Sequence, residues 1–206
     1  DDKPDMSNLS CKENIQNSSY DFFYDIIKKP DTCQQIYLSY LDGQKEQFDK
    51  ILGPRLKPRV GLVLEGKTSH VHNHLRSMNA SDFIKILPQG VNYFLLQKEL
   101  SSRTKDLIRN RPDVRNLSKL FSNFSDTAAA CANMDLIISV DTAVAHLAGA
   151  IGCRTNLLLH YQSDWRWGLE TKTSHWYSNM SLIRLKRNGE WSDTFGEISA
   201  TISSIL

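Results

Sequence analysis

The chain has 206 residues, of which 40% are hydrophobic and 23% charged, an ordinary globular mixture. This length allows one domain of usual size with an extension, but not two complete Rossmann domains. The formal net charge of +2, without blocks of like charge, argues against nucleic acid as the main partner, and no apolar run approaches the ~20 residues of a membrane span.

The N-terminal stretch gives the first indication of context. It starts with Asp rather than Met and is polar, without the hydrophobic segment of a signal peptide. The four cysteines form no Cys-x-x-Cys pair, and we interpret them as free thiols in a reducing compartment. We therefore expect a fragment or a processed chain that resides in the cytoplasm.

Two parts of the chain differ in character. Residues 1–58 open with polar residues and contain one amphipathic helix, expected over 43–53 and terminated by Gly53 and Pro54. They show no alternation of strands and helices and are predicted to be an N-terminal extension. Residues 59–206 are predicted to form the domain.

From residue 59 onward, predicted strands alternate with predicted helices. Short apolar runs such as VGLVL and DLIISV are typical of strands buried on both faces of a parallel sheet. The alternation predicts an α/β fold: a Rossmann-like parallel sheet of about six strands with helices on both faces. Strands are expected over 60–64, 91–97, 114–117, 135–140, 154–160 and 181–186. Helices are expected over 80–87, 101–110, 125–134 (with Ser125 or Asp126 as N-cap), 142–152 and 195–206.

The segment SVDTAVAHLAGAIG is the most informative in the chain. Asp141 stands between a buried strand and an apolar helix, where it can accept hydrogen bonds from sugar hydroxyls. The free amides of Thr142, Ala143 and Val144 at the helix start can hold a phosphate, and His146 lies one turn further on. A second interpretation stays open, in which Asp141 is only an N-cap and His146 only a buried core histidine.

Three sequence segments carry a family resemblance. FSDTAAACANMDLIISVDTAVAHLAGAIG resembles the C-terminal domain of glycosyltransferase family 9, the lipopolysaccharide heptosyltransferases, in the branch found behind tetratricopeptide repeats in bacterial proteins. That branch commonly has Asp-Thr-Ala-Val-Ala-His, as here. SDWRWGLETKTSHWYSNMSLIRLKRNGEW and VGLVLEGKTSHVHNHLRS extend the resemblance over roughly residues 59–191.

The resemblance implies a two-domain enzyme of GT-B architecture that transfers a sugar with inversion and without a metal ion. This chain would carry the donor-binding C-terminal domain, and residues 1–58 would be the remnant of an acceptor domain with its linker. The catalytic base would lie on the missing domain, so the chain alone is expected to bind donor without turnover. An inactive nucleotide-binding, sugar-binding or scaffold module is the alternative. A Rossmann oxidoreductase would need Gly-x-Gly-x-x-Gly after the first strand, which LEGKTSH lacks.

Site residues also follow from the resemblance. The donor diphosphate and sugar would contact a set spread over two loops: Thr68, Ser69, Arg76, Asp141, Thr142, Ala143, Val144 and His146. The nucleoside would lie near Gln97, Lys98, Glu99 and Phe124, although Phe124 could equally belong to the core.

Aromatic residues follow the fifth predicted strand. Asp164, Trp165, Arg166 and Trp167 are interpreted either as a sugar platform or as a surface that packs against a partner domain. Tyr177, further along, is expected to pack within its loop.

Partners and cofactors complete the expectations. The partners would be a nucleoside-diphosphate sugar and a glycan or lipid-linked sugar acceptor, with peripheral contact to the inner face of the bacterial inner membrane left open. His70, His72 and His74 could share one face of an extended loop, but no Cys or carboxylate cluster adjoins them. We therefore expect no metal and no cofactor.

Overall fold

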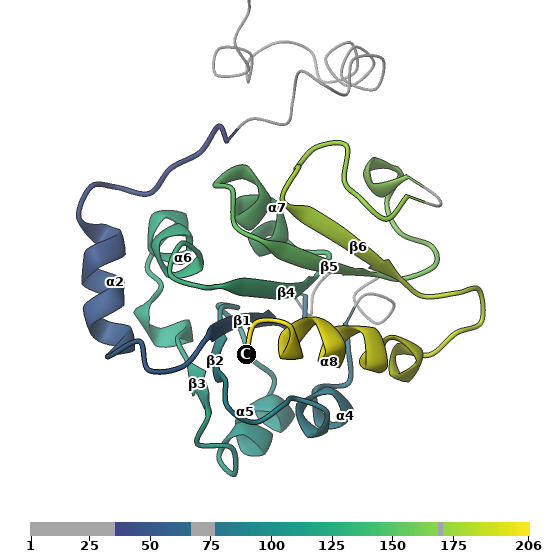
Figure 1. The fold of residues 1–206 in the computed structure, drawn as a ribbon, viewed down its shortest axis with the longest axis horizontal. Coiled ribbons are helices and arrows are strands. Elements are labelled where there is room, and N and C mark those ends of the chain that lie inside the picture. The colour runs from purple at the N-terminus through teal and green to yellow at the C-terminus, as the bar shows by residue number, and fades with distance from the viewer. Residues whose placement is uncertain (1–35, 67–76, 169–170) are drawn as a thin grey trace, which may run out of the picture.

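The computed structural model describes residues 36–66, 77–168 and 171–206, which build one parallel sheet covered by helices (Figure 1). The six strands lie in the order β3-β2-β1-β4-β5-β6, and every neighbouring pair is parallel. The strands are β1 (Arg59–Val63), β2 (Asn92–Leu95), β3 (Val114–Asn116), β4 (Leu136–Val140), β5 (Thr155–Leu159) and β6 (Met180–Arg184). The predicted Rossmann-like fold class is thereby confirmed.

Helices connect successive strands and cover both faces of the sheet. They are α2 (Gln44–Leu52), α4 (Ala80–Lys85), α5 (Ser102–Ile108), α6 (Phe124–Cys131), α7 (Ala143–Ala150) and α8 (Phe195–Ser203), with short 3-10 turns η3 (Ser118–Leu120), η4 (Trp165–Trp167) and η5 (Trp191–Thr194). In Figure 1, α4, α5 and α8 lie on one side of the sheet and α2, α6 and α7 on the other. Each predicted helix is present, most of them a few residues shorter than expected.

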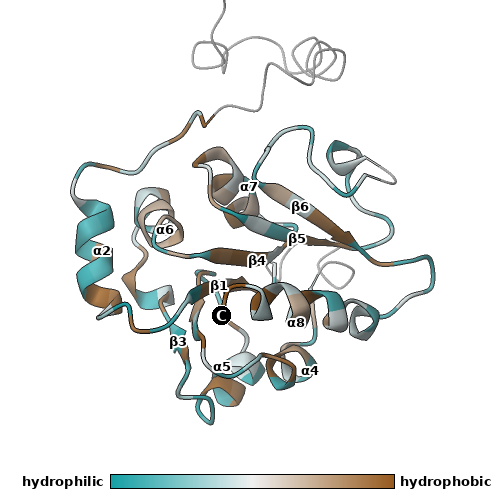
Figure 2. Ribbon diagram, viewed as in Figure 1, coloured by the Kyte–Doolittle hydropathy of each residue, from teal (hydrophilic) through white to brown (hydrophobic). Residues whose placement is uncertain are grey.

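The apolar runs of the sequence form the central strands. All five residues of β1, β4 and β5 are buried, because helices cover both faces of these strands. Figure 2 shows β4 hydrophobic along its length, whereas α2, with only Phe48 and Leu52 buried, is largely hydrophilic. The hydropathy of each element thus matches its depth in the fold.

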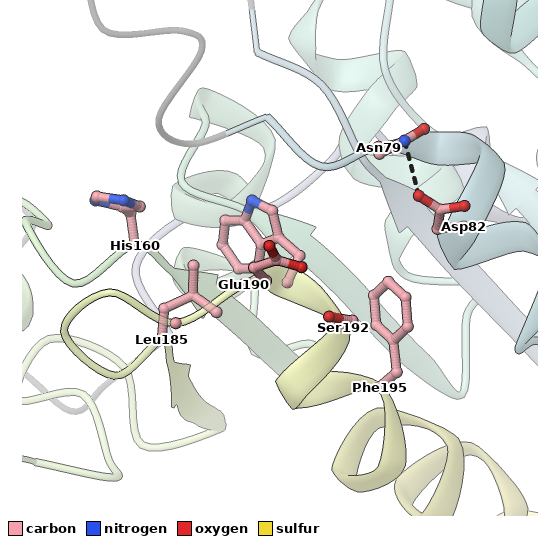
Figure 3. A pocket seen from close by; sticks show the side chains of 9 residues that line it. Asn79, Asp82, His160, Leu185, Glu190, Ser192 and Phe195 are labelled. Carbon is pink, nitrogen blue, oxygen red and sulfur yellow. Dashed lines mark hydrogen bonds between the residues drawn. The ribbon is translucent and has the colours of Figure 1, made fainter.

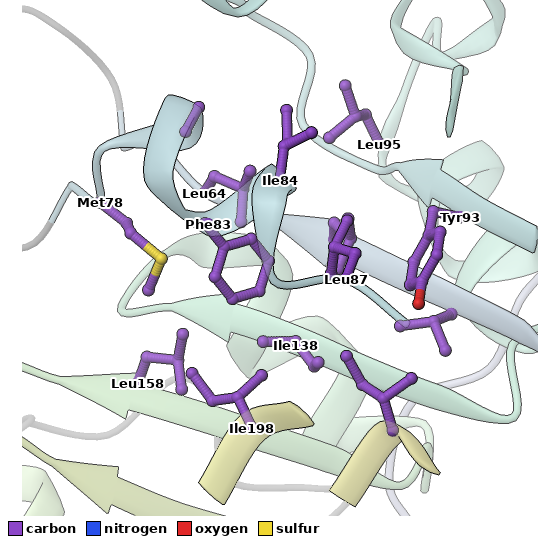
Figure 4. Packing of buried hydrophobic residues seen from close by; sticks show 14 of the residues in the cluster. Leu64, Met78, Phe83, Ile84, Leu87, Tyr93, Leu95, Ile138, Leu158 and Ile198 are labelled. Carbon is purple, nitrogen blue, oxygen red and sulfur yellow. The ribbon is translucent and has the colours of Figure 1, made fainter. Parts of the chain in front are cut away.

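One hydrophobic core lies between the sheet and the helices α4 and α8 (Figure 4). Phe83 of α4 and Ile198 of α8 are fully buried there against Ile138 of β4 and Leu158 of β5. On the opposite face, α2, α6 and α7 bury a second set of residues, which includes Phe48, Ala130 and Ala148. The described part of residues 1–58 therefore packs onto the domain through α2.

The cap of α6 differs from the prediction. Asn123 is the N-cap, because its side chain accepts a hydrogen bond from the Asp126 amide at 3.1 Å. The Asp126 carboxylate in turn accepts from the Asn123 amide at 3.1 Å, which completes a capping box. The expected cap at Ser125 or Asp126 was therefore wrong, since Asp126 occupies the third helical position of this motif.

Arg59 ties α2 to the first strand. Its guanidinium group is buried and donates to the Asp49 carboxylate and to the carbonyl of Gly53, both at 2.6 Å. The Asp135 carboxylate accepts from the Arg59 amide at 2.8 Å and also pairs with Arg55. This network closes the amino end of the sheet, opposite the edge at which ligands of such folds bind.

Because the guanidinium of Arg59 is buried, we expect its removal to destabilise the protein more than removal of an exposed arginine side chain. Arg59→Ala should lower the free energy of unfolding by about 2–4 kcal/mol, because it removes the buried stem and leaves the Gly53 carbonyl without its donor. Arg109→Ala is the control: that side chain is 77% exposed and forms a surface ion pair with Asp106, so the expected loss is below about 0.5 kcal/mol. Urea unfolding measures both, and equal losses would contradict the role given to Arg59.

Candidate functional site

The start of α7 is the centre of the candidate site. Thr142 is its N-cap residue, and the Thr142 side chain makes no capping hydrogen bond to the helix. The Thr142 hydroxyl lies instead 3.3 Å from the hydroxyl of buried Ser139, one of the last residues of β4. The Thr142 side chain therefore caps neither of the first-turn amides of Ala143 and Val144, and Ala143 is exposed. A helix start of this kind suits an anion.

Gln97 holds together the loops that follow β1 and β2. Its side-chain oxygen accepts hydrogen bonds from the amides of Leu64 (2.8 Å) and Glu65 (3.3 Å). Its side-chain nitrogen donates to the carbonyl of Glu99 at 3.0 Å. Gln97 was predicted to lie near a nucleoside, and the structure places it 4% exposed with both ends of its amide bonded within the protein. It positions the two loops relative to each other.

Glu65 lies in the loop after β1 and has a structural role for which the sequence offered no sign. Its carboxylate accepts from the amide and hydroxyl of Ser101, at 3.1 and 2.9 Å, and from the hydroxyl of Thr104. It thereby joins the loop after β1 to the start of α5. A single Glu in a polar loop carries no sequence signal for this role.

His146 lies on α7 between the core and the site. Its Nδ1 is 3.0 Å from the Tyr177 hydroxyl, and its ring stacks on Trp167 with 4.9 Å between centroids and 25° between planes. Its Nε2 lies 3.9 Å from an Asp141 carboxylate oxygen. Burial lowers the pKa of His146, and the Asp141 carboxylate opposes that shift only in part. The imidazole is thus neutral and half-buried, and the contact of His146 with a ligand stays a prediction.

Gly149 leaves the space that the Tyr177 ring fills beside His146. It follows His146 by three residues on α7, so both lie on the same helix face. A Cβ atom at Gly149 would lie 2.7 Å from two carbons of the Tyr177 ring, closer than real Cβ contacts come. Tyr177 is buried, as expected, and its packing on Gly149 brings the hydroxyl within reach of the imidazole.

The two tryptophans after β5 have different environments. Trp167 is 1% exposed and belongs to the core, so it offers no platform to a sugar. Trp165 is 55% exposed and meets Trp176 edge to face, 6.5 Å between centroids. Asp164 caps this short turn by accepting from the Arg166 amide at 3.0 Å and pairs with the Arg166 guanidinium at 3.1 Å. Burial therefore excludes Trp167 from the predicted set, whereas the choice between sugar platform and domain interface stays a prediction for Asp164, Trp165 and Arg166.

The remaining predicted residues are divided between the surface and the undescribed segments. Phe124 begins α6 and is 63% exposed, so its interpretation as a core residue was wrong. Lys98 and Glu99 are exposed, and the Lys98 ammonium donates to the Phe121 carbonyl. The candidates in the loop after β1 lie outside the described residues: Thr68, Ser69, Arg76, His70, His72 and His74.

The described residues contain neither a metal-binding cluster nor a helix that could cross a membrane. Within 36–66, 77–168 and 171–206, no three His, Cys, Asp or Glu residues gather in a way that could hold a metal ion. Over the same ranges, no helix has the length and apolar character needed to cross a membrane.

A cavity of about 390 Å³ opens at the same edge of the sheet, beside the carboxyl ends of β5 and β6 (Figure 3). Asp82, Glu190 and the indole of Trp191 line it together with His160, and no Lys or Arg belongs to its described lining. Carboxylates beside an aromatic ring suit a neutral, hydroxyl-rich group better than a phosphate. The full lining is Asn79, Asp82, His160, Leu185, Gly189, Glu190, Trp191, Ser192 and Phe195.

Three solved structures share this fold. They are E. coli ADP-heptose lipopolysaccharide heptosyltransferase II (14% identity, TM-score 0.55), the E. coli heptosyltransferase WaaC with ADP (18%, 0.56) and a family 9 glycosyltransferase from Veillonella parvula (13%, 0.56). The similarity covers 81%, 73% and 90% of this chain, respectively, but only 53%, 45% and 52% of those chains. The chain therefore has a heptosyltransferase-like fold of the kind found in glycosyltransferase family 9 and spans about half of such a structure.

Sequence comparison adds little to this assignment. No protein-family model matches the chain. Protein FlbA of Caulobacter vibrioides is 31% identical over 83 residues, which are 40% of this chain and 14% of that protein. The fold assignment therefore rests on the arrangement of strands and helices.

Replacing a glycine within a helix by alanine normally stabilises a protein, but at Gly149 we expect the opposite. Gly149→Ala should lower the free energy of unfolding by about 1–3 kcal/mol, because the new methyl group collides with the Tyr177 ring. Gly196→Ala in α8 is the matched control: nothing lies within 4 Å of its Cβ position, so the substitution should add about 0.5–1 kcal/mol. Thermal unfolding of the two variants compares them. A stabilised Gly149→Ala protein would show that Tyr177 does not pack there.

Proposed function

We propose that this chain is the donor-binding part of a glycosyltransferase and binds a nucleoside-diphosphate sugar at the start of α7. The observation that carries the proposal is the start of α7, which Thr142 does not cap with its side chain and which lies directly after β4 where the strand order reverses. The likeness in fold to heptosyltransferases, one of them solved with ADP, makes ADP the first nucleotide to test.

In this proposal, the amides of Ala143 and Val144 and the neutral imidazole of His146 face the diphosphate. Asp141 accepts hydrogen bonds from the sugar hydroxyls. Preorganised donors stabilise the negative charge that builds up on the leaving nucleoside diphosphate, so a metal ion is not required for that step. Arg76, Thr68 and Ser69 would add a cation and two hydroxyls from the loop after β1.

The acceptor side of the reaction would lie beyond this chain. We place the base that deprotonates the acceptor hydroxyl on a further domain, since the chain spans about half of the heptosyltransferase chains that it matches. The hydroxyl would attack the anomeric carbon from the face opposite the diphosphate, which inverts the configuration. The cavity beside Trp191 offers room for a hydroxyl-rich group at the same edge.

A proline substitution at Ala143 tests the role of the helix amides. Thr142 has φ −145° and ψ 167°, which suits a residue before proline, and proline is well tolerated at a first helical position. Ala143→Pro should therefore keep the fold but remove one amide donor and weaken ADP binding by about 10-fold or more. Isothermal titration calorimetry with ADP, UDP and GDP measures the affinities.

Ala143→Val is the matched control, since it adds bulk at the same position but keeps the N–H group. Its affinity for ADP should lie within about threefold of that of the original chain. An equal loss of ADP affinity in Ala143→Pro and Ala143→Val would mean that the added bulk, and not the missing amide, weakens binding. A folded chain that binds none of the three nucleotides would reject the donor site and favour a scaffold module.

A further inference from the structure

Three aromatic side chains from distant parts of the sequence form one hydrogen-bonded chain. The Tyr177 hydroxyl lies 3.0 Å from His146 Nδ1 and 3.3 Å from the Tyr37 hydroxyl. His146 and Tyr177 are separated by 31 residues, and Tyr37 and Tyr177 by 140. Tyr37 lies in the segment before α2, so this chain of hydroxyls joins that segment to the candidate site.

The direction of the hydrogen bonds follows from counting protons. A neutral imidazole has one N–H donor and one nitrogen acceptor, whereas an ionised carboxylate only accepts. Nε2 faces the Asp141 carboxylate, so a proton on Nε2 avoids placing two lone pairs toward each other. Nδ1 is then the acceptor. Tyr177 donates its only hydroxyl proton to Nδ1, and the Tyr177 oxygen accepts from Tyr37.

We propose that Tyr177 and Tyr37 are positioning residues that hold neutral His146 in the tautomer with the proton on Nε2. This tautomer presents an N–H donor toward the start of α7. The consequence for ligand binding rests on the proposed function, since the donor would face the diphosphate of a nucleotide.

Packing around His146 supports a single ring orientation. The stack on Trp167 fixes the plane of the imidazole, and the hydrogen bond with Tyr177 decides which nitrogen points inward. Burial raises the pKa of Tyr177, so its hydroxyl keeps its proton at neutral pH.

Tyr37 is itself held in place by the end of α7. The amides of Tyr37 and Leu38 both donate to the carbonyl of Ala150, at 3.1 and 3.2 Å. The Tyr37 ring stacks on that of Tyr177, with 6.4 Å between centroids and 21° between planes. The segment before α2 therefore packs against α7, the helix that carries His146.

Nitrogen-15 NMR of the full chain tests the tautomer directly. Long-range correlation spectra recorded near about pH 8, where histidine is neutral, distinguish a protonated from an unprotonated ring nitrogen. The chain has six histidines, so His146→Gln assigns the signal. We expect Nε2 protonated and Nδ1 unprotonated. A protonated Nδ1 would overturn the proposal.

Hydroxyl deletions test the two tyrosines. Tyr177→Phe should shift the His146 signals toward a mixture of both tautomers, and Tyr37→Phe should shift them less in the same direction. Tyr93→Phe is the control, because the Tyr93 hydroxyl donates to the Pro88 carbonyl on the α4 side of the sheet and should change nothing at His146. Signals that stay unchanged in Tyr177→Phe would overturn the role of Tyr177. Unchanged signals in Tyr37→Phe, whose hydroxyl lies further from the imidazole, would overturn the role of Tyr37.

Nucleotide affinity separates this inference from the proposed function. Tyr177→Phe should weaken ADP binding about 3- to 10-fold, as expected for one misdirected hydrogen bond. A shifted tautomer with unchanged ADP affinity would overturn the link to the ligand. If the original chain binds no nucleoside diphosphate, the proposed function fails, while the NMR result still decides the tautomer.

Discussion

The reversal of strand order between β1 and β4 is the constraint on which the site depends. The chain leaves β1 toward β2 and β3, then returns to β4 on the other side of β1 and continues outward to β6. The connection after β1 runs through α4 on one face of the sheet, and the connection after β4 runs through α7 on the other (Figure 1). The two connections therefore leave the carboxyl edge toward opposite faces of the sheet, the position at which ligands of such folds bind. The start of α7 lies at this point, and Gln97 and Glu65 fix the loop beside it.

Helix α7 carries both the small residues that pack against the sheet and the histidine of the candidate site. Ala145 and Ala148 are buried in the cores on this face of the sheet, where small side chains let the helix approach closely. Gly149 costs about 1 kcal/mol of helix stability relative to alanine, yet it makes space for the Tyr177 ring. His146 lies between them, held on one side by Trp167 and Tyr177 and open on the other toward Asp141. The stability of this helix and the orientation of its one titratable side chain thus come from the same contacts.

The sequence predicted features that follow from local periodicity and missed those that depend on distant contacts. Apolar runs and helical spacing located all six strands and the helices between them, because burial on both faces leaves a continuous pattern. The cap of α6 was misplaced because the run SNFSD offers several residues able to cap, and only backbone geometry selects Asn123. The sequence also did not decide which of Trp165 and Trp167 is exposed, since side chains two residues apart in a 3-10 turn point in different directions. Tyr177 carried no sign of its contact with His146, which spans 31 residues of loop and strand.

The distribution of charge around the carboxyl edge bears on how a ligand would lie there. The helix start at Ala143 provides amide donors and partial positive charge, whereas the cavity beside β5 and β6 is lined by the carboxylates of Asp82 and Glu190. A phosphate in that cavity would face two like charges, but sugar hydroxyls could donate to them. On the proposed function, the phosphates of a nucleoside-diphosphate sugar would therefore lie at the start of α7 and not in this cavity. Of the two places, only the helix start is favourable for an anion, because its amide donors carry partial positive charge whereas the cavity presents carboxylates.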